Sequence, residues 1–135
     1  MKNPLVTGVS KDYFGNFRYP VTLPSATATA HSSTATIAES ALVNLNHTNT
    51  GAAGGVVLTI PSATKFAMQG FRVFVTAAQT VGISPAATER IWLAGSGVLN
   101  KDVEIAATIG NYADIYSDGT DWHCVRSNGV VTKEA

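Results

Sequence analysis

The chain has 135 residues, which is enough for one domain with a hydrophobic core. Nine lysines and arginines balance nine aspartates and glutamates, so no long-range field attracts phosphate backbones or anionic lipid, and we expect neither nucleic acid nor a membrane as a partner. Only 13% of the residues are charged and 45% are hydrophobic, which is little surface charge for a protein that stays soluble alone. We therefore expect a partner to cover part of the surface.

Cysteine content and hydropathy limit the possible chemistry and compartment. The single cysteine, Cys124, excludes an internal disulfide and any multi-cysteine metal site. The N-terminal run MKNPLVTGVSKDYFGNF lacks a continuous apolar segment, and no uncharged apolar run reaches the roughly 18 residues of a transmembrane helix. These features predict synthesis in the cytosol.

Residues 1–33 differ in composition from the rest of the chain, and we interpret them as an extended N-terminal arm. They contain Pro4, Pro20 and Pro24 together with the low-complexity run SATATAHSST. Proline fixes φ and lacks an N–H, so this stretch suits neither a helix interior nor a central strand. Its aromatic side chains either fold back on their own domain or, as we favour, dock on a neighbouring subunit. These partner-binding candidates are Tyr13, Phe14, Phe17 and Tyr19.

Residues 34–135 have the pattern of a compact β domain. Short runs rich in Val, Ile, Thr and aromatic residues alternate with Gly, Asn, Asp and Ser, which is typical of strands joined by turns. Strands at such close spacing predict an all-β fold, either a compact antiparallel sandwich or a jelly-roll-like barrel. No stretch has a sustained helical period, although residues 86–92 could form a single helical turn. The expected strands are 34–39, 42–48, 55–60, 71–76, 80–84, 90–94, 103–106, 112–117, 122–127 and 130–132.

Two dipeptides indicate turns near the C-terminus. Asp118-Gly119 lies between two long strand runs and Asn128-Gly129 follows the second run, and both dipeptides suit turns that need a positive φ. Trp122 opens the strand after the first turn. We place this tryptophan in the core, beside the structural turn formed by Asp118 and Gly119.

The histidines and the cysteine form no catalytic or metal-binding pattern. His31, His47 and His123 lie in unrelated segments and lack the spacing of a helical zinc site. Cys124 follows His123, but neighbouring strand residues point to opposite faces, so the two cannot form a nucleophile–base pair. Cys124 shares the face of Trp122, and we expect a buried, unreactive thiol.

Other candidate sites have simpler structural interpretations. The glycine-rich stretch 51–55 lacks the Lys-Ser/Thr ending of a phosphate-binding loop and precedes a strand. Asp118 and Asp121 bracket a turn, where aspartate commonly accepts hydrogen bonds from local backbone N–H groups. The adjacent charges of Glu89 and Arg90 are expected to be solvated. Because no acid, base or nucleophile clusters with another, we expect no enzyme and no catalytic, cofactor-binding or metal-binding residue.

Two segments of the C-terminal half, 71–85 (FRVFVTAAQTVGISP) and 109–122 (IGNYADIYSDGTDW), resemble a β module that recurs in virion proteins of tailed bacteriophages. In that module a glycine precedes an alternating strand, and Ser-Asp-Gly-Thr with an aromatic residue opens the next strand. Residues 49–61 are similar to its preceding segment, a glycine-rich loop and an apolar strand ending in proline. The resemblance covers roughly residues 34–132 and leaves the arm unmatched. The matching motif positions are Gly110, Ser117, Asp118, Gly119, Thr120 and Trp122.

The resemblance implies a structural role, because the motif residues of that module are structural. The preferred hypothesis is a capsid decoration (cement) protein, a homotrimer that binds the major capsid protein, possesses no cofactor and stabilises the head. It would be made in the host bacterial cytoplasm and would lie on the capsid surface of the virion. The alternative is a head-fibre or tail-fibre receptor-binding tip that recognises bacterial surface glycan. That alternative predicts exposed rings in a shallow groove, among them Tyr112, Tyr116 or Trp92.

Overall fold

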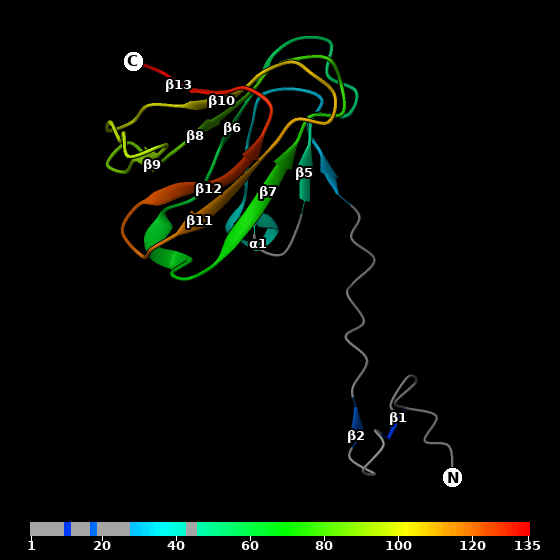
Figure 1. Ribbon diagram of the computed structural model, residues 1–135, viewed down its shortest axis with the longest axis vertical. Coiled ribbons are helices and arrows are strands. Elements are labelled where there is room, and N and C mark those ends of the chain that lie inside the picture. The colour runs from blue at the N-terminus through cyan, green and yellow to red at the C-terminus, as the bar shows by residue number, and fades with distance from the viewer. Residues whose placement is uncertain (1–9, 12–16, 19–27, 43–45) are drawn as a thin grey trace.

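The computed structural model describes residues 10–11, 17–18, 28–42 and 46–135 (Figure 1). It contains a small two-stranded ribbon and a sandwich of two larger sheets. In the ribbon, β1 (Ser10–Lys11) pairs antiparallel with β2 (Phe17–Arg18).

The sandwich consists of a six-stranded and a five-stranded sheet. The six-stranded sheet has the order β3 (Thr29–Ala30), β5 (Asn46–Thr48), β7 (Gly70–Phe74), β11 (Tyr112–Ser117), β12 (Trp122–Asn128) and β9 (Ile91–Trp92). The five-stranded sheet has the order β13 (Val131–Lys133), β10 (Val103–Ile105), β8 (Val81–Ser84), β6 (Val56–Thr59) and β4 (Ala35–Thr36).

The all-β sandwich predicted from the sequence is confirmed, but its strand pairing is mixed rather than purely antiparallel. β11 is antiparallel to both of its neighbours, β7 and β12, and β10 is antiparallel to both β8 and β13. β3, β5 and β7 are parallel to one another, and so are β4, β6 and β8. At the other edge of the six-stranded sheet, β9 is parallel to β12.

The parallel pairs arise because the chain passes from one sheet to the other at each step from β3 to β8. β3, β5 and β7 join the six-stranded sheet, whereas β4, β6 and β8 join the five-stranded sheet. Two neighbours in one sheet are therefore separated along the chain by a strand of the opposite sheet. Such a crossover returns the chain in its original direction, which gives parallel pairing.

The inward-facing side chains of both sheets form one hydrophobic core. Trp122 is completely buried, with the ring of Phe71 edge-on at 5.6 Å and the ring of Phe66 at 6.1 Å between centroids. In β7 and β11, buried and half-buried side chains alternate, as a two-residue period requires. The other large apolar side chains with almost no exposure are Leu42, Leu58, Ile60, Ile83, Ile91, Ile105, Ile115, Val73, Val75 and Val81.

The helical segments differ from those expected. A short helix, α1 (Glu39–Leu42), begins where the strand expected over 34–39 should end. A 3-10 turn, η1 (Ala63–Lys65), follows β6, whereas residues 86–92 form a turn and then β9, so the helical turn expected there is wrong. Within the part of the chain that the structure describes, no helix has the length and apolar character needed to cross a membrane.

The sandwich starts earlier in the chain than the expected boundary after residue 33. β3 lies inside the segment assigned to the arm, yet it pairs with β5, with Thr29 opposite His47 and Ala30 opposite Thr48. Residues 29–30 therefore belong to the six-stranded sheet. The arm hypothesis applies to the residues that precede them.

Candidate binding surface on the six-stranded sheet

The outward side of the six-stranded sheet carries half-buried aromatic and charged side chains. Because side chains alternate along a strand, residues 112, 114 and 116 of β11 point outward while Ala113, Ile115 and Ser117 are buried. The register brings β7, β12 and β9 residues beside them. We call this surface the aromatic face. It consists of Arg72, Phe74, Trp92, Tyr112, Asp114, Tyr116 and His123.

Two rings and an ion pair from β7 and β11 pack together on the aromatic face. The rings of Phe74 and Tyr112 are stacked, with centroids 6.2 Å apart and 9° between their planes. The guanidinium carbon of Arg72 lies 4.1 Å from the centroid of the Tyr112 ring. Arg72 also donates hydrogen bonds to both carboxylate oxygens of Asp114, at 2.6 and 2.9 Å, which raises the pKa of Arg72. This part of the face is electrically neutral and internally hydrogen-bonded.

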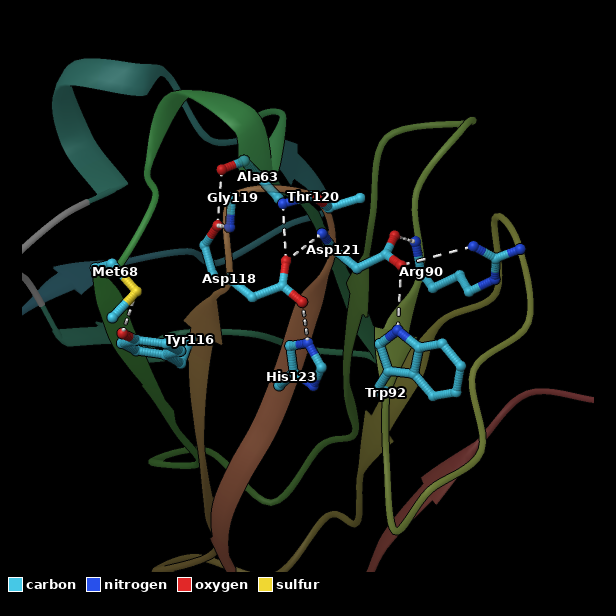
Figure 2. Close-up of polar contacts among 11 residues, drawn as sticks. Ala63, Met68, Arg90, Trp92, Tyr116, Asp118, Gly119, Thr120, Asp121 and His123 are labelled. Atoms are coloured by element: carbon cyan, nitrogen blue, oxygen red, sulfur yellow. Dashed lines mark hydrogen bonds and ion pairs between the residues drawn. The ribbon is translucent and has the colours of Figure 1, made fainter.

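The turn between β11 and β12 is held by the carboxylate of Asp118 (Figure 2). Its Oδ1 accepts hydrogen bonds from the N–H groups of Thr120 at 2.7 Å and Asp121 at 2.8 Å, while Oδ2 lies 2.7 Å from Nε2 of His123. The N–H of Asp121, then His123 and the N–H of Thr120, lower the pKa of Asp118 to about 2. Gly119 has a φ of 94°, which glycine adopts without strain. An ionised carboxylate thus fixes both the turn and the His123 ring.

Asp121 holds Trp92 from the same turn (Figure 2). Its Oδ1 accepts a hydrogen bond from the backbone N–H of Arg90 at 2.8 Å, and its Oδ2 accepts one from the indole Nε1 of Trp92 at 3.1 Å. Nη1 of Arg90 lies 3.6 Å from the same Oδ2. The Trp92 and His123 rings are stacked, with centroids 6.3 Å apart and 14° between planes. Side chains of the turn therefore orient both rings.

Atoms of this chain cover part of the ring surfaces. A Cβ on Gly97 would come within 2.5 Å of the Trp92 ring, so the Gly97 backbone lies against the indole. Arg72 lies over the ring of Tyr112. Tyr116 lies opposite Gly70, which has no side chain, and its hydroxyl donates to Sδ of Met68 at 3.1 Å. The rings form a packed surface rather than a row of free stacking platforms.

Buried polar groups support the hairpin from beneath. Glu89 is only 5% exposed, and its carboxylate oxygens accept hydrogen bonds from the N–H of Ala63 at 3.1 and 2.9 Å. The expectation that Glu89 is solvated is wrong, because the loop between β8 and β9 turns its carboxylate onto this donor. The hydroxyl of Ser117 donates to the carbonyl of Ala63 at 2.7 Å, and Nε1 of Trp122 donates to the carbonyl of Pro61 at 3.2 Å. The turn is thereby attached to the segment after β6.

Of the four aromatic residues proposed for the arm, the structure describes only Phe17. Tyr13, Phe14 and Tyr19 lie outside the described residues. Phe17 lies in β2, where it is paired with Lys11 of β1. Their role as partner contacts stays a prediction.

The other residues singled out from the sequence lie in the core or in the turn between β11 and β12. Trp122 is fully buried, and Asp118 and Gly119 form the turn above it. Cys124 is half-buried opposite Ile115, and burial raises the pKa of its thiol. Over the described ranges, no three His, Cys, Asp or Glu side chains gather closely enough to hold a metal ion.

Sequence analysis missed Arg72, Phe74 and Asp114 as members of one surface. Alternation alone places Arg72 and Phe74 on one face of their strand, and it places Tyr112 and Asp114 on one face of another. It does not show which strands are neighbours. Only the pairing of β7 with β11 brings the two sets together.

A depression of 240 Å³ lies on the opposite sheet, away from the aromatic face. Gly82 lines this depression, and a Cβ at that position would lie 3.2 Å from Cγ2 of Val57. Acidic residues and a single lysine surround it, and nothing in the described residues indicates a ligand. Its lining residues are Val57, Gly82, Asp102, Glu104, Thr132, Lys133 and Glu134.

Comparison with known proteins finds no matching family model, no matching curated protein and no matching solved structure. The function is therefore argued from the residues themselves.

Proposed function

We propose that this chain is a capsid decoration (cement) protein of a tailed bacteriophage, which binds the major capsid protein on the outside of the head. The observation that carries the proposal is the aromatic face, where aromatic rings and an arginine lie half-exposed on a regular sheet. Aromatic residues and arginine are enriched in protein interfaces and in their binding hot spots. A protein that acts through such a face needs no catalytic group.

The charged groups of the aromatic face have partners in this chain. Arg72 is paired with Asp114, and His123 contacts Asp118. Covering the face with another protein would therefore leave these groups hydrogen-bonded, which avoids the penalty of burying an isolated charge. Side chains that are already held in place also lose less conformational entropy on binding. Both properties favour a close contact with a protein surface.

The N-terminal arm supports a second contact. β1 and β2 pair with each other and with no strand of the sandwich, so neither sheet depends on them for its described pairing. An extended segment of this kind can add a strand to the exposed sheet edge of a neighbouring protein. With zero net charge and few charged residues, self-association as a homotrimer is part of the proposal. Sedimentation of the isolated protein measures that state directly.

The alternative, a fibre tip that recognises bacterial glycan, has weaker support. Tyr112, Tyr116 and Trp92 do lie on one outward surface, as that alternative requires. However, sugar stacking needs an accessible ring face, and Gly97 lies against Trp92 while Arg72 lies over Tyr112. The covered rings favour a protein partner over a sugar.

The test uses one substitution on each sheet surface. Tyr116→Ala removes a ring from the aromatic face, and Thr132→Ala changes the outward surface of β13 on the other sheet. Binding to capsids that lack the protein should weaken by roughly tenfold or more for Tyr116→Ala, because truncating an interface hot spot commonly causes a loss of that size. Thr132→Ala should bind as the unaltered protein does. Co-sedimentation with capsids gives the affinity, and circular dichroism checks that both variants fold.

The opposite pattern would contradict the proposal. If Tyr116→Ala folds and decorates capsids fully while Thr132→Ala does not, the contact lies on the five-stranded sheet. If the unaltered protein binds host surface polysaccharide but no capsid, the glycan alternative replaces decoration.

A further inference from the structure

Two histidines from distant parts of the chain meet at the base of the N-terminal arm. His47 lies in β5 and is completely buried, and His31 directly follows β3 and is half-buried. Nε2 of His31 lies 3.0 Å from Nδ1 of His47, and the two rings are stacked with centroids 5.3 Å apart. This histidine pair joins the edge strand β3 to its neighbour β5 through side chains.

The surroundings of His47 determine which nitrogen carries its proton. Its Nε2 lies 3.4 Å from the carbonyl oxygen of Leu42, which can only accept a hydrogen bond. Nε2 of His47 therefore carries the proton and Nδ1 is the acceptor. His31 then donates from its own Nε2, and one proton on each ring satisfies this contact. The edge of the Phe71 ring completes the apolar side, at 5.8 Å between centroids.

A second proton on His47 has no acceptor unless His31 gives up the proton on its Nε2. It would have to occupy Nδ1, where the N–H of His31 already points, so two donors would face each other at 3.0 Å. The resulting cation would also be buried, and burial disfavours the charged form. The first proton on the pair is therefore opposed by burial, and protonation of both rings requires them to separate.

Among the residues that the structure describes, no nearby charged group offsets that cation. On α1, Glu39 is exposed and forms an ion pair with Lys65. On β7, Arg72 points to the outward side of the sheet and pairs with Asp114. Residues 28–38, which include β3 and β4, contain no ionisable side chain except His31, and residues 43–45 contain none.

β3 has few other attachments. It is a two-residue edge strand and pairs only with β5. The backbone N–H of His31 donates to the carbonyl of Thr48 at 2.8 Å, so this hydrogen bond forms only while the two strands stay together.

We infer that the His31–His47 pair is a pH-sensitive switch that holds β3, and with it the base of the arm, on the sandwich at neutral pH and releases it in mild acid. This goes beyond the proposed function, and it does not depend on which partner the arm contacts.

The direction in which pH changes the attachment of β3 follows from proton linkage. Burial lowers the pKa of both His31 and His47 below the ordinary value of 6.5. The released state then binds protons more readily than the attached state does. Attachment is strongest above pH 6.5 and weakens as the pH falls from 6.5 towards the lowered pKa values, by at most about tenfold per pH unit for each additional proton bound.

The test measures amide hydrogen exchange of the full chain by NMR between about pH 7.5 and pH 5, corrected for the intrinsic exchange rate. Protection of the His31 amide should fall as the pH decreases from 6.5, by up to about tenfold per pH unit for each proton bound. The Trp122 amide, which donates to the carbonyl of Arg90 at 3.0 Å, should keep its protection. His47→Phe retains a ring beside Phe71 without a titrating group, and it should abolish the pH dependence at His31. His123→Gln, which changes the histidine far from β3, should leave that dependence intact.

Two results would overturn the inference. One is constant protection of the His31 amide in the unaltered protein, and the other is an unchanged pH dependence in His47→Phe. If His47→Phe does not fold, NMR titration of the histidine ring protons in the unaltered protein replaces it. The switch requires both histidines to titrate below pH 6.5 together with the loss of amide protection in β3. Titration of the histidines while β3 stays protected would contradict the switch.

Discussion

At the residue scale, Trp122 links the core to the candidate binding surface. Its side chain is the largest of those that are completely buried, and its indole N–H reaches the carbonyl of Pro61. Trp122→Ala should lower the free energy of unfolding by about 3–5 kcal/mol, because it leaves a large cavity. Urea unfolding measures the change. Val125→Ala, in the same strand but 62% exposed, should change it by less than about 0.5 kcal/mol. An unaltered midpoint for Trp122→Ala would contradict the buried position.

Asp118 makes stability depend on pH in a defined range. Its pKa in the folded protein is about 2, against an ordinary value of 3.8. A lowered carboxylate pKa contributes stability above the ordinary value, and that contribution is lost as the pH falls from 3.8 towards 2. Asp118→Asn should therefore be less stable at neutral pH and should lose less stability across that acid range. Unfolding midpoints at several pH values test this. Parallel declines in both proteins would show that Asp118 does not cause the dependence.

At the scale of elements, the contact between β7 and β11 depends on Gly70. A Cβ at this position would lie 2.6 Å from the carbonyl oxygen of Ile115, which is too close for any real contact. Gly70→Ala should push the two strands apart and lower the free energy of unfolding by about 1–3 kcal/mol. Gly54→Ala is the matched control, since nothing lies within 4 Å of its Cβ. Thermal unfolding compares them, and equal stability of the two variants would contradict the close approach.

The strands from β6 onward were predictable from the sequence, whereas β3, the helix α1 and the neighbours of each strand were not. Alternation in β7 and β11 and the Asp118-Gly119 turn identified a hairpin and its buried face, since these signals lie within a few residues. No short sequence pattern identifies the parallel pairing of β5 with β7, because β6, a strand of the other sheet, lies between them in the sequence. Burial of Glu89 was missed for the same reason: its donor, the N–H of Ala63, is 26 positions away. The aromatic face depends on such distant pairings, and so only Trp92, Tyr112 and Tyr116 could be named as candidates for an exposed surface.

At the scale of the whole molecule, we expect the sandwich to fold without the arm, and we propose that the arm contacts a partner. A chain that begins at Ala28 retains β3 and both sheets of the sandwich. We expect it to keep the circular dichroism and unfolding midpoint of the full chain, because no described strand of the sandwich pairs with β1 or β2. Its affinity for capsids that lack the protein should fall, since the proposed anchors at Tyr13, Phe14, Phe17 and Tyr19 are removed. Co-sedimentation measures that loss.

The outcomes of this truncation locate the contact. Unfolding of the shortened chain would show that the aromatic residues belong to its own core or to an interface between copies. Full decoration by a folded, shortened chain would remove the four arm residues from the binding site and leave the aromatic face as the contact.

The passage of the chain between the two sheets determines the order in which the molecule can fold. Among the described strands of the sandwich, β11 and β12 are the only ones consecutive in sequence that also pair. Every other pair closes a long stretch of chain, so the contact order is high and folding should be slow compared with that of a meander. β7 finds its antiparallel partner only when β11 is made, and β9 waits for β12. A ribosome-bound chain that stops before Trp122 therefore presents incomplete apolar sheets, and we expect it to be more prone to aggregation than the finished chain.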